Sequence, residues 1–202
     1  MRFSPVLWFV VILSVLASAS PVAQTPGVAG ESARRPDLGS KQDLDPRNLS
    51  PHSGIGLKAA IQRALSARPG MAVEAELEGE QVNGRLHVVY EVSVITPEHQ
   101  LVEVLVDPKT GEILAQQPET EPDDVQELQR FENLLWHTEL SLVQLIEKGE
   151  ALLKASPVLA ELDFENSQPL AEILFVQGRY LIECEVEARA GHVIELELED
   201  GN

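Results

Sequence analysis

The chain has 202 residues, of which 44% are hydrophobic and 4% aromatic, so it can form one ordinary domain or two small ones with an aliphatic core. Its 33 acidic residues outnumber its 15 basic residues and give a net charge of −18. This charge argues against nucleic-acid binding, which depends on basic side chains that neutralise phosphates, and against adsorption to anionic membranes. The single cysteine, Cys184, excludes an intramolecular disulfide.

Residues 1–19 are predicted to form a signal peptide. Arg2 precedes an apolar run over residues 6–16, and Ala17-Ser18-Ala19 supplies the small residues of a cleavage site. The run is marginal for spanning a bilayer, so cleavage is favoured over the alternative, an uncleaved anchor that would be the only membrane attachment. We therefore expect a periplasmic or secreted protein, whose net charge changes from −18 to −19 when Arg2 is removed.

Residues 20–53 are predicted to be a disordered tether, because they are rich in Pro, Gly, Ser, Ala and Asp and show no apolar period. A first domain is predicted over residues 54–117. It opens with apolar residues at helical spacing, followed by the helix-ending pair Pro69-Gly70. The residues at this spacing are Leu57, Ala60, Ile61, Ala64 and Leu65.

Three strands are predicted to follow this helix, over residues 71–79, 85–95 and 101–106. The first alternates apolar residues with glutamates, and Asn83-Gly84 marks a tight turn before the second. The segment Asp107-Pro108-Lys109-Thr110-Gly111 then predicts a turn, because Asp accepts backbone hydrogen bonds, Pro presets φ and Gly tolerates positive φ. A short last strand over 112–115 completes an antiparallel meander of three to four strands.

Residues 118–139 are predicted to be an acidic, helical linker. Pro122-Asp123-Asp124 favours a helix start, and the apolar period from Val125 to Leu135 predicts a helix that covers the first domain. The sequence leaves open whether this helix continues past Thr138 or breaks there.

A second domain is predicted over residues 140–202. Leu142, Leu145 and Ile146 mark the apolar face of a helix, and Ser141 with Gln144 forms a capping box at its start. A loop is expected from Pro157 to Pro169, followed by strands over 170–176, 180–188 and 193–199. Laying residues 90–107 over residues 182–199 without gaps brings Glu91 onto Glu183 and Glu103 onto Glu195. With the helix that precedes each hairpin, this favours an internal duplication over the alternative, chance alternation in two hairpins.

Residues 56–114 resemble the PepSY family. The matching features are the helix motif L-x-x-A-I-x-x-A-L over 57–65, the strand V-Y-E-V-x-V over 89–94, and the closing V-x-V-D-x-x-T-G-E-I-L over 104–114. Residues from about 140 to 202 resemble a degenerate second copy that lacks the D-x-x-T-G-E ending and offers Glu199-Asp200-Gly201-Asn202 instead. The resemblance implies an α+β fold of two tandem units, each a helix packed on an antiparallel meander of three to four strands.

The family resemblance also implies a role without catalysis. Such modules occur in propeptides of thermolysin-type metallopeptidases and in exported bacterial proteins, where protein binding or peptidase inhibition has been proposed. No catalytic residues come with the family, so we predict no catalytic, cofactor or metal residues. We expect a protein or peptide partner, such as a peptidase, in the cell envelope.

The candidate residues for catalysis do not form a known motif. His52, His87, His99, His137 and His192 include no metal-ligand spacing, and Glu98-His99 is expected in a solvated turn. Cys184 shares one strand face with Ile182 and Val186, which predicts a buried hydrophobe rather than a reactive thiol. We therefore predict that the protein is not an enzyme.

The C-terminal hairpin suggests an alternative function. Its register is predicted to place Glu185 opposite Glu195 and Glu183 opposite Glu197, with Glu187 and Glu199 on the same face. Clustered carboxylates repel one another and can bind hard cations, so an extracytoplasmic cation-binding or sensing module is the alternative to a protein-binding one. On the preceding strand Ala171, Ile173 and Phe175 are expected to pack on the helix, with Leu174 and Val176 outward.

Overall fold

The structure is a computed structural model that describes residues 44–82, 85–119, 126, 128–129, 131–132, 138–165 and 168–199. The predicted signal peptide and the predicted tether up to residue 43 lie outside the described residues. None of the helices in the part of the chain that the structure describes combines the length and apolar character needed to cross a bilayer.

A helix followed by four strands occurs twice along the chain, after a short helical lead-in. In order, the elements are α1 (Pro46–Leu49), the 3-10 helix η1 (Ser50–His52), α2 (Leu57–Ala67), β1 (Met71–Val82), β2 (Arg85–Ile95), β3 (Leu101–Val106), β4 (Ile113–Pro118), α4 (Leu142–Leu153), β5 (Ser156–Glu165), β6 (Gln168–Gln177), β7 (Tyr180–Glu187) and β8 (Val193–Glu199).

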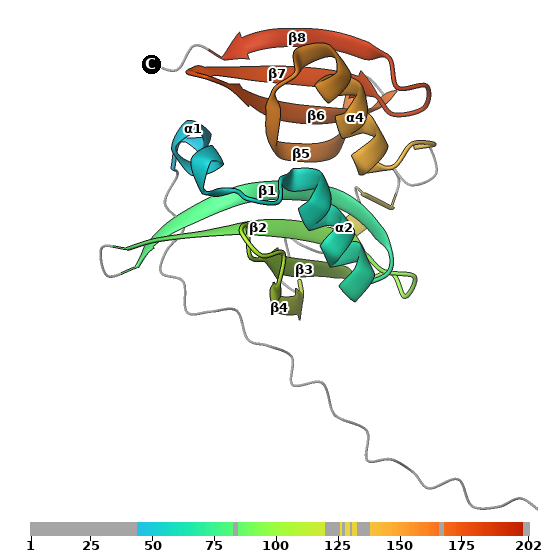
Figure 1. The fold of residues 1–202 in the computed structure, drawn as a ribbon. Helices are drawn as coiled ribbons and strands as arrows, with labels where there is room; N and C mark the ends of the chain where they lie inside the picture. Colours follow the sequence, from blue (N-terminus) through green and yellow to red (C-terminus); the bar gives the residue numbers. More distant parts are fainter. Residues whose placement is uncertain are drawn as a thin grey trace, which may run out of the picture. The chain divides into compact units, whose positions relative to one another are not determined.

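The eight strands form one continuous antiparallel sheet in the order β4-β3-β2-β1-β5-β6-β7-β8. Helices α2 and α4 lie side by side on one face of the sheet (Figure 1). Helix α2 packs on β1, β2 and β3, and α4 packs on β5, β6 and β7. The fold is therefore of the α+β class, and it joins the two predicted meanders edge to edge.

The junction between β1 and β5 is short. Only three residue pairs connect the strands, namely Glu74 with Glu161, Ala75 with Ala160, and Glu76 with Leu159. Both alanines are fully buried. Beyond these pairs the strands are not paired with each other, which leaves space between the halves at both ends of the junction.

The two helices bury equivalent faces. Helix α2 buries Leu57, Ala60, Ile61 and Ala64, and α4 buries Leu142, Leu145, Ile146 and Gly149 with the same spacing. The capping box predicted for Ser141 and Gln144 is confirmed, because each side chain hydrogen-bonds the other residue's backbone N–H. Burial of these aliphatic side chains contributes about 1.5–3 kcal/mol for each large residue and fixes each helix on its half of the sheet.

The turns that follow β3 and β7 also match. The amide of Gly111 donates to the carbonyl of Asp107 at 2.9 Å, and the amide of Gly191 donates to the carbonyl of Glu187 at 2.9 Å. Both glycines have positive φ, 74° and 73° respectively, a conformation that other residues rarely adopt. Asp107 accepts further hydrogen bonds from the amides of Lys109 and Thr110, so its carboxylate organises the turn as predicted.

These turns also hold the segment before each helix. The carbonyl of Pro108 accepts from the amides of Gly54 and Ile55, and the carbonyl of Ala188 accepts from the amides of Glu139 and Leu140. The turn is therefore a structural clamp that fixes where the helix begins, which explains why a turn motif and a helix motif occur together.

The predicted loop from Pro157 to Pro169 is wrong, because strand β5 occupies most of it. Pro157 at its start and Leu159 on its outward face obscured the alternation of buried Val158, Ala160 and Leu162. The predicted alignment of residues 90–107 with residues 182–199 is consequently displaced by one strand.

In the structure β3 corresponds to β7, since each pairs with the second strand of its half. The counterpart of Asp107 is therefore Glu187 and not Glu199. The second half does contain a turn equivalent to D-x-x-T-G-E, formed by residues 187–192. Strands predicted over 85–95 and 101–106 are confirmed as β2 and β3.

The predicted tether is too long at its C-terminal end, because residues 44–53 contain α1 and η1. Leu49 is buried against β1 at Gly79, where an added Cβ would lie 2.5 Å from Leu49 Cδ2. Asp45 caps α1, and Arg47 Nη1 donates to the carbonyl of Arg179 at 3.1 Å. An apolar anchor and a salt-bridged cap thus order a segment whose composition indicates disorder.

The predicted helix between the halves is helical at each described position from 126 to 132, and Phe131 is fully buried. Its start at Pro122-Asp123-Asp124 lies outside the described residues. Residues 138–141 are not helical, so this helix does not continue into α4.

Replacement of Gly149 by Ala tests the packing of α4 on the sheet. A Cβ at this position would lie 2.7 Å from Cζ of Phe175, a fully buried ring. We expect Gly149→Ala to lower the free energy of unfolding by about 1–2 kcal/mol in urea titrations, because overpacking outweighs the gain in helix propensity. The double variant Gly149→Ala/Phe175→Leu should recover part of the loss, and a stabilising effect of Gly149→Ala alone would contradict this packing.

Candidate functional site

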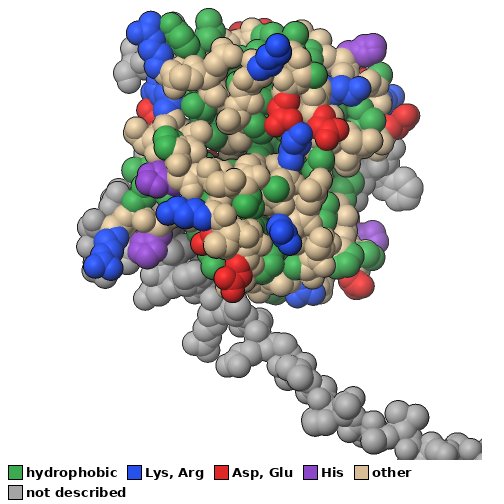
Figure 2. Space-filling model, in the orientation of Figure 1, with side chains coloured by type: hydrophobic (Ala, Val, Ile, Leu, Met, Phe, Trp, Pro, Cys, Tyr) green, Lys and Arg blue, Asp and Glu red, His purple; other side chains and the backbone are tan. Residues whose placement is uncertain are grey.

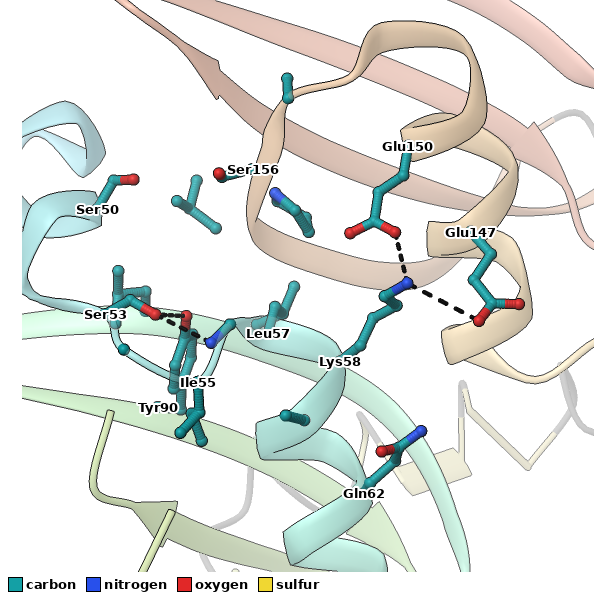
Figure 3. Close-up of a pocket in the computed structure, with 17 residues that line it drawn as sticks. Ser50, Ser53, Ile55, Leu57, Lys58, Gln62, Tyr90, Glu147, Glu150 and Ser156 are labelled. Carbon is teal, nitrogen blue, oxygen red and sulfur yellow. Dashed lines mark hydrogen bonds and ion pairs between the residues drawn. The ribbon is translucent and has the colours of Figure 1, made fainter. Parts of the chain in front are cut away.

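A cavity of about 510 Å³ lies between the two halves on the helix-bearing side of the sheet. It opens where β1 and β5 cease to pair, so Leu77 of β1 and Val158 of β5 both line it. The segment from Ser50 to Ala59 lines it from the first half, and Glu147, Glu150 and the start of β5 line it from the second. Figure 3 shows polar side chains from both halves that point into this space.

Lys58 connects the helices across the cavity. Its Nζ lies 2.5 Å from Glu150 Oε2 and 3.8 Å from Glu147 Oε1, so a side chain of α2 is held by two carboxylates of α4 (Figure 3). The hydrogen bond that Lys58 donates to Glu150 raises the pKa of Lys58 above its ordinary value, against the opposing effect of partial burial. Lys58 therefore remains a cation at neutral pH and does not supply a free amine for nucleophilic chemistry.

On the other side of the cavity, Tyr90 OH and Ser53 Oγ are hydrogen-bonded at 2.6 Å. The amide of Gly56 also donates to Ser53 Oγ at 3.2 Å. Burial raises the pKa of Tyr90, and the contact with Ser53 opposes this only in part, so the phenol stays neutral. Among the described residues that line the cavity there is no His, Cys or Asp beside a hydroxyl.

A second cavity of about 340 Å³ lies between the C-terminal end of α2 and the start of α4. It corresponds to the first cavity, because Gly70, Met71 and Ala72 occupy the place that Ala155, Ser156 and Pro157 occupy there. When Leu57 of α2 is aligned with Leu142 of α4, Lys58 is equivalent to Val143 and Leu65 is equivalent to Glu150. The two ends of the groove between the helices therefore differ in chemistry: one contains the ion pair of Lys58, and the other is lined mainly by apolar side chains.

The predicted register of the acidic hairpin is confirmed. Glu185 lies opposite Glu195 and Glu183 lies opposite Glu197, and these four side chains surround a hollow of about 150 Å³. In the described part of the chain, no three carboxylate, imidazole or thiol groups are placed to hold a metal ion. The structure therefore adds no ligand set to the cation-binding alternative.

The carboxylates of the hairpin belong to a longer row on the face without helices. Cross-strand pairing connects Glu195, Glu185, Glu172, Glu161 and Glu74 over five adjacent strands. Figure 2 looks onto the opposite, helix-bearing face, where basic side chains are spread out and acidic ones gather at only a few points. The acidity of the strands is thus concentrated on one side of the sheet.

Cys184 is buried in the core with Ile182 and Val186, as predicted. Its Sγ lies beneath α4, 3.5 Å from the position of a Cβ on Gly149. Burial raises the pKa of this thiol to about 11, with a further contribution from the charge of Glu185. The predicted orientation of the side chains on β6 is confirmed as well. Ala171, Ile173 and Phe175 are fully buried, while Leu174 and Val176 are partly buried.

The histidines that the structure describes lie on separate elements. His52 is in η1, His87 is in β2, and His192 is in the turn before β8. His99 lies in the predicted turn, where its Nδ1 is 2.7 Å from Glu132 Oε1. His137 lies outside the described residues.

Sequence reasoning missed the groove, because its polar residues come from segments that lie far apart in the chain. Lys58, Glu147 and Glu150 are ordinary charged positions on two amphipathic helices. The only local signal is the helical spacing of Glu147 and Glu150, and this spacing does not indicate that a lysine of another helix lies opposite.

Residues 54–117 match the model of the PepSY family, described as the peptidase propeptide and YPEB domain. The chain carries a PepSY domain. This domain contains α2, β1, β2 and β3 and most of β4. Hydrogen bonds from the amides of Gly54 and Ile55 to the carbonyl of Pro108 connect its first residues to the turn before β4. Its most specific motif, centred on Asp107 and Gly111, therefore has a structural role in this protein.

Among solved structures, a protein of Clostridium difficile 630 that is provisionally described as a lipoprotein is similar to this chain. The TM-score is 0.43 at 17% sequence identity, and the match covers 73% of this chain and 95% of that chain. No curated protein matches the chain at a significant level. The family assignment rests on the PepSY model.

The Lys58 ion pair predicts a specific pH dependence. The pKa of Lys58 is raised above 10.5 in the folded state, so its stabilisation is present below that pH and is lost as pH rises through the folded pKa. We expect Lys58→Met to lower the free energy of unfolding by about 0.5–1.5 kcal/mol at neutral pH, with the difference from the unmodified protein shrinking above pH 10.5. Lys148→Met, at an exposed position of α4, is the control, and an equal effect from it would contradict a specific clamp.

The burial of Cys184 predicts a protected thiol. A shift of its pKa from 9.0 to about 11 reduces the thiolate fraction at pH 8 about a hundredfold, and burial blocks access as well. We expect a chromogenic disulfide reagent to label the native protein only as fast as it unfolds, and to label it within the mixing time in denaturant. Rapid stoichiometric labelling of the native protein would contradict this placement.

Proposed function

We propose that this protein is an exported, non-catalytic binding module that takes a protein or peptide partner in the cell envelope. The family to which its PepSY domain belongs is described by its occurrence in peptidase propeptides, which makes a peptidase the first partner class to test. The predicted signal peptide over 1–19 supports export, and the polar cavity without a nucleophile–base pair among its described lining residues fits binding rather than catalysis.

We further propose that residues 140–202 are a second, degenerate PepSY-type unit. The same element order, the same buried helix positions, and the same contacts from Pro108 and Ala188 support this proposal. The unit begins near Glu139, whose amide hydrogen-bonds Ala188, and the residues after 117 connect it to the first. The length of the chain is sufficient for two units of this size.

The observation that carries the binding proposal is the open architecture of the sheet. Within the described residues β4 pairs only with β3 and β8 pairs only with β7, so the two units joined at β1 and β5 leave two sheet edges. Edge strands present unpaired backbone N–H and C=O groups, to which an extended segment of another protein can add as a strand. We expect this protein to use such an edge to hold a peptidase or a segment of its substrate.

Partner capture tests the proposal. Residues 20–202, immobilised through the N-terminal segment, should retain a peptidase from an envelope extract and change its rate of casein hydrolysis when added back in solution. An unrelated exported protein of similar negative charge is the control for electrostatic adsorption. Recovery of no peptidase above this control, together with unchanged hydrolysis, would contradict the proposed function.

A further inference from the structure

We propose that β8 is the docking edge, and that its partner is an extended segment in which basic and apolar side chains alternate. This inference rests on the proposed function and specifies which edge is used and what it recognises. It follows from the exposure of β8, from comparison with the equivalent strand β4, and from the charges on the two faces of the strand.

Strand β8 presents apolar side chains to solvent. The exposed fractions of Ile194, Leu196 and Leu198 are 51%, 45% and 65%, although the strand belongs to a well-formed sheet. Leu196 and Leu198 lie opposite Cys184 and Ile182, so they are on the helix-bearing face, beside the core and not beneath α4. Adjacent exposed apolar side chains on an edge strand are typical of an interface.

The equivalent edge of the first half shows that the fold does not require these leucines. Both last strands are displaced by one residue at the same point, between Leu105 and Val106 for β4 and between Glu185 and Val186 for β8. In this register Gln116 occupies the position of Leu196, and Pro118 occupies the position of Leu198. A polar residue and a terminal proline at these positions blunt an edge strand, whereas β8 has leucine at both of them.

The other face of β8 determines the charge of the partner. Glu195 and Glu197 are exposed and point away from the helices, and each already faces another glutamate on β7. A strand that adds to β8 places its own side chains directly opposite these residues. Lysine or arginine at alternate positions would pair with Glu195 and Glu197, while apolar residues between them would cover Leu196 and Leu198.

This chemistry disfavours a second copy of the chain as the partner. Pairing of two β8 strands would bring the glutamates of one copy close to those of the other, in a protein whose net charge is −18. A basic, alternating strand satisfies both faces, so we assign the edge to a segment of a different protein.

A peptide in which lysine and valine alternate over the length of β8, labelled with fluorescein, is the probe. Fluorescence anisotropy with residues 20–202 should show binding at least about tenfold tighter than for a peptide of the same composition with lysines and valines in separate blocks. Methylation of alternate backbone nitrogens in the probe should abolish the difference, because it removes the hydrogen bonds of strand addition. Equal binding of the alternating and blocked peptides would overturn the proposal, since charge alone would then explain it.

Variants locate the site. Leu196→Gln, which introduces the residue that β4 carries, and Glu195→Gln/Glu197→Gln should each weaken binding of the probe about fivefold or more. Glu112→Gln, which removes an exposed carboxylate beside β4, should leave it unchanged. Amide chemical shifts should change on addition of the probe in β7 and β8. Changes confined to the groove between α2 and α4 would overturn the assignment.

Two further outcomes separate this inference from the proposed function. Retention of a peptidase that Leu196→Gln and Glu195→Gln/Glu197→Gln do not weaken would overturn the role of β8 and leave the binding function intact. Self-association of the unmodified protein that Leu196→Gln abolishes, measured by sedimentation, would show that a second copy occupies the edge and would overturn the assigned partner. The isosteric Glu→Gln changes keep the test valid if Leu196→Gln does not fold.

Discussion

The pairing of β1 with β5 is the constraint on which the rest of the structure depends. Because these strands are antiparallel neighbours, the two meanders extend in opposite directions from one junction, and both helices come to lie on the same face. The sheet edges at β4 and β8 are placed as far apart as the sheet allows. The junction itself has only three residue pairs, so its strength depends on other contacts between the halves.

Those contacts include one continuous hydrophobic core, to which buried side chains of both halves belong. Above the sheet, the ion pair of Lys58 with Glu150 connects the two helices. Arg47 connects the lead-in helix of the first half to the carbonyl of Arg179 in the second. Cavities nevertheless remain at both ends of the groove between the helices.

Local chemistry was sufficient to predict much of each half. The alternation of residues 85–95, the turn around Asp107 and the capping box at Ser141 depend on neighbours in the chain, and all are present in the structure. The missed strand β5 is different, because Leu159 lies on its outward face opposite Leu174, and only a partner strand shows that this position is not part of the core. The ion pair of Lys58 also depends on a helix many residues away.

The displaced repeat alignment has the same origin as the missed strand. Alternating glutamates and apolar residues fit any strand of this sheet equally well, so an alignment by pattern has no fixed register. The glycine turns provide the register, because Gly111 and Gly191 each close a clamp on the segment before their helix. A repeat of this kind is better aligned by its positive-φ glycines than by its strands.

Differences between the equivalent positions of the two halves explain where function can reside. The row of glutamates from Glu195 to Glu74 continues into the first half as Ser93, Glu103 and Gln117, and Gln117 Nε2 donates to Glu103 Oε2 at 3.1 Å. The first half therefore has two carboxylates along this row, Glu74 and Glu103, whereas the second half has a glutamate on each of its four strands. The row ends at the neutral Gln117 on β4 and at the acidic Glu195 on β8, so the two sheet edges differ in charge although the backbone is similar. An extended partner of the kind proposed therefore meets different side chains at the two edges, and specificity is expected to reside in the more acidic second half.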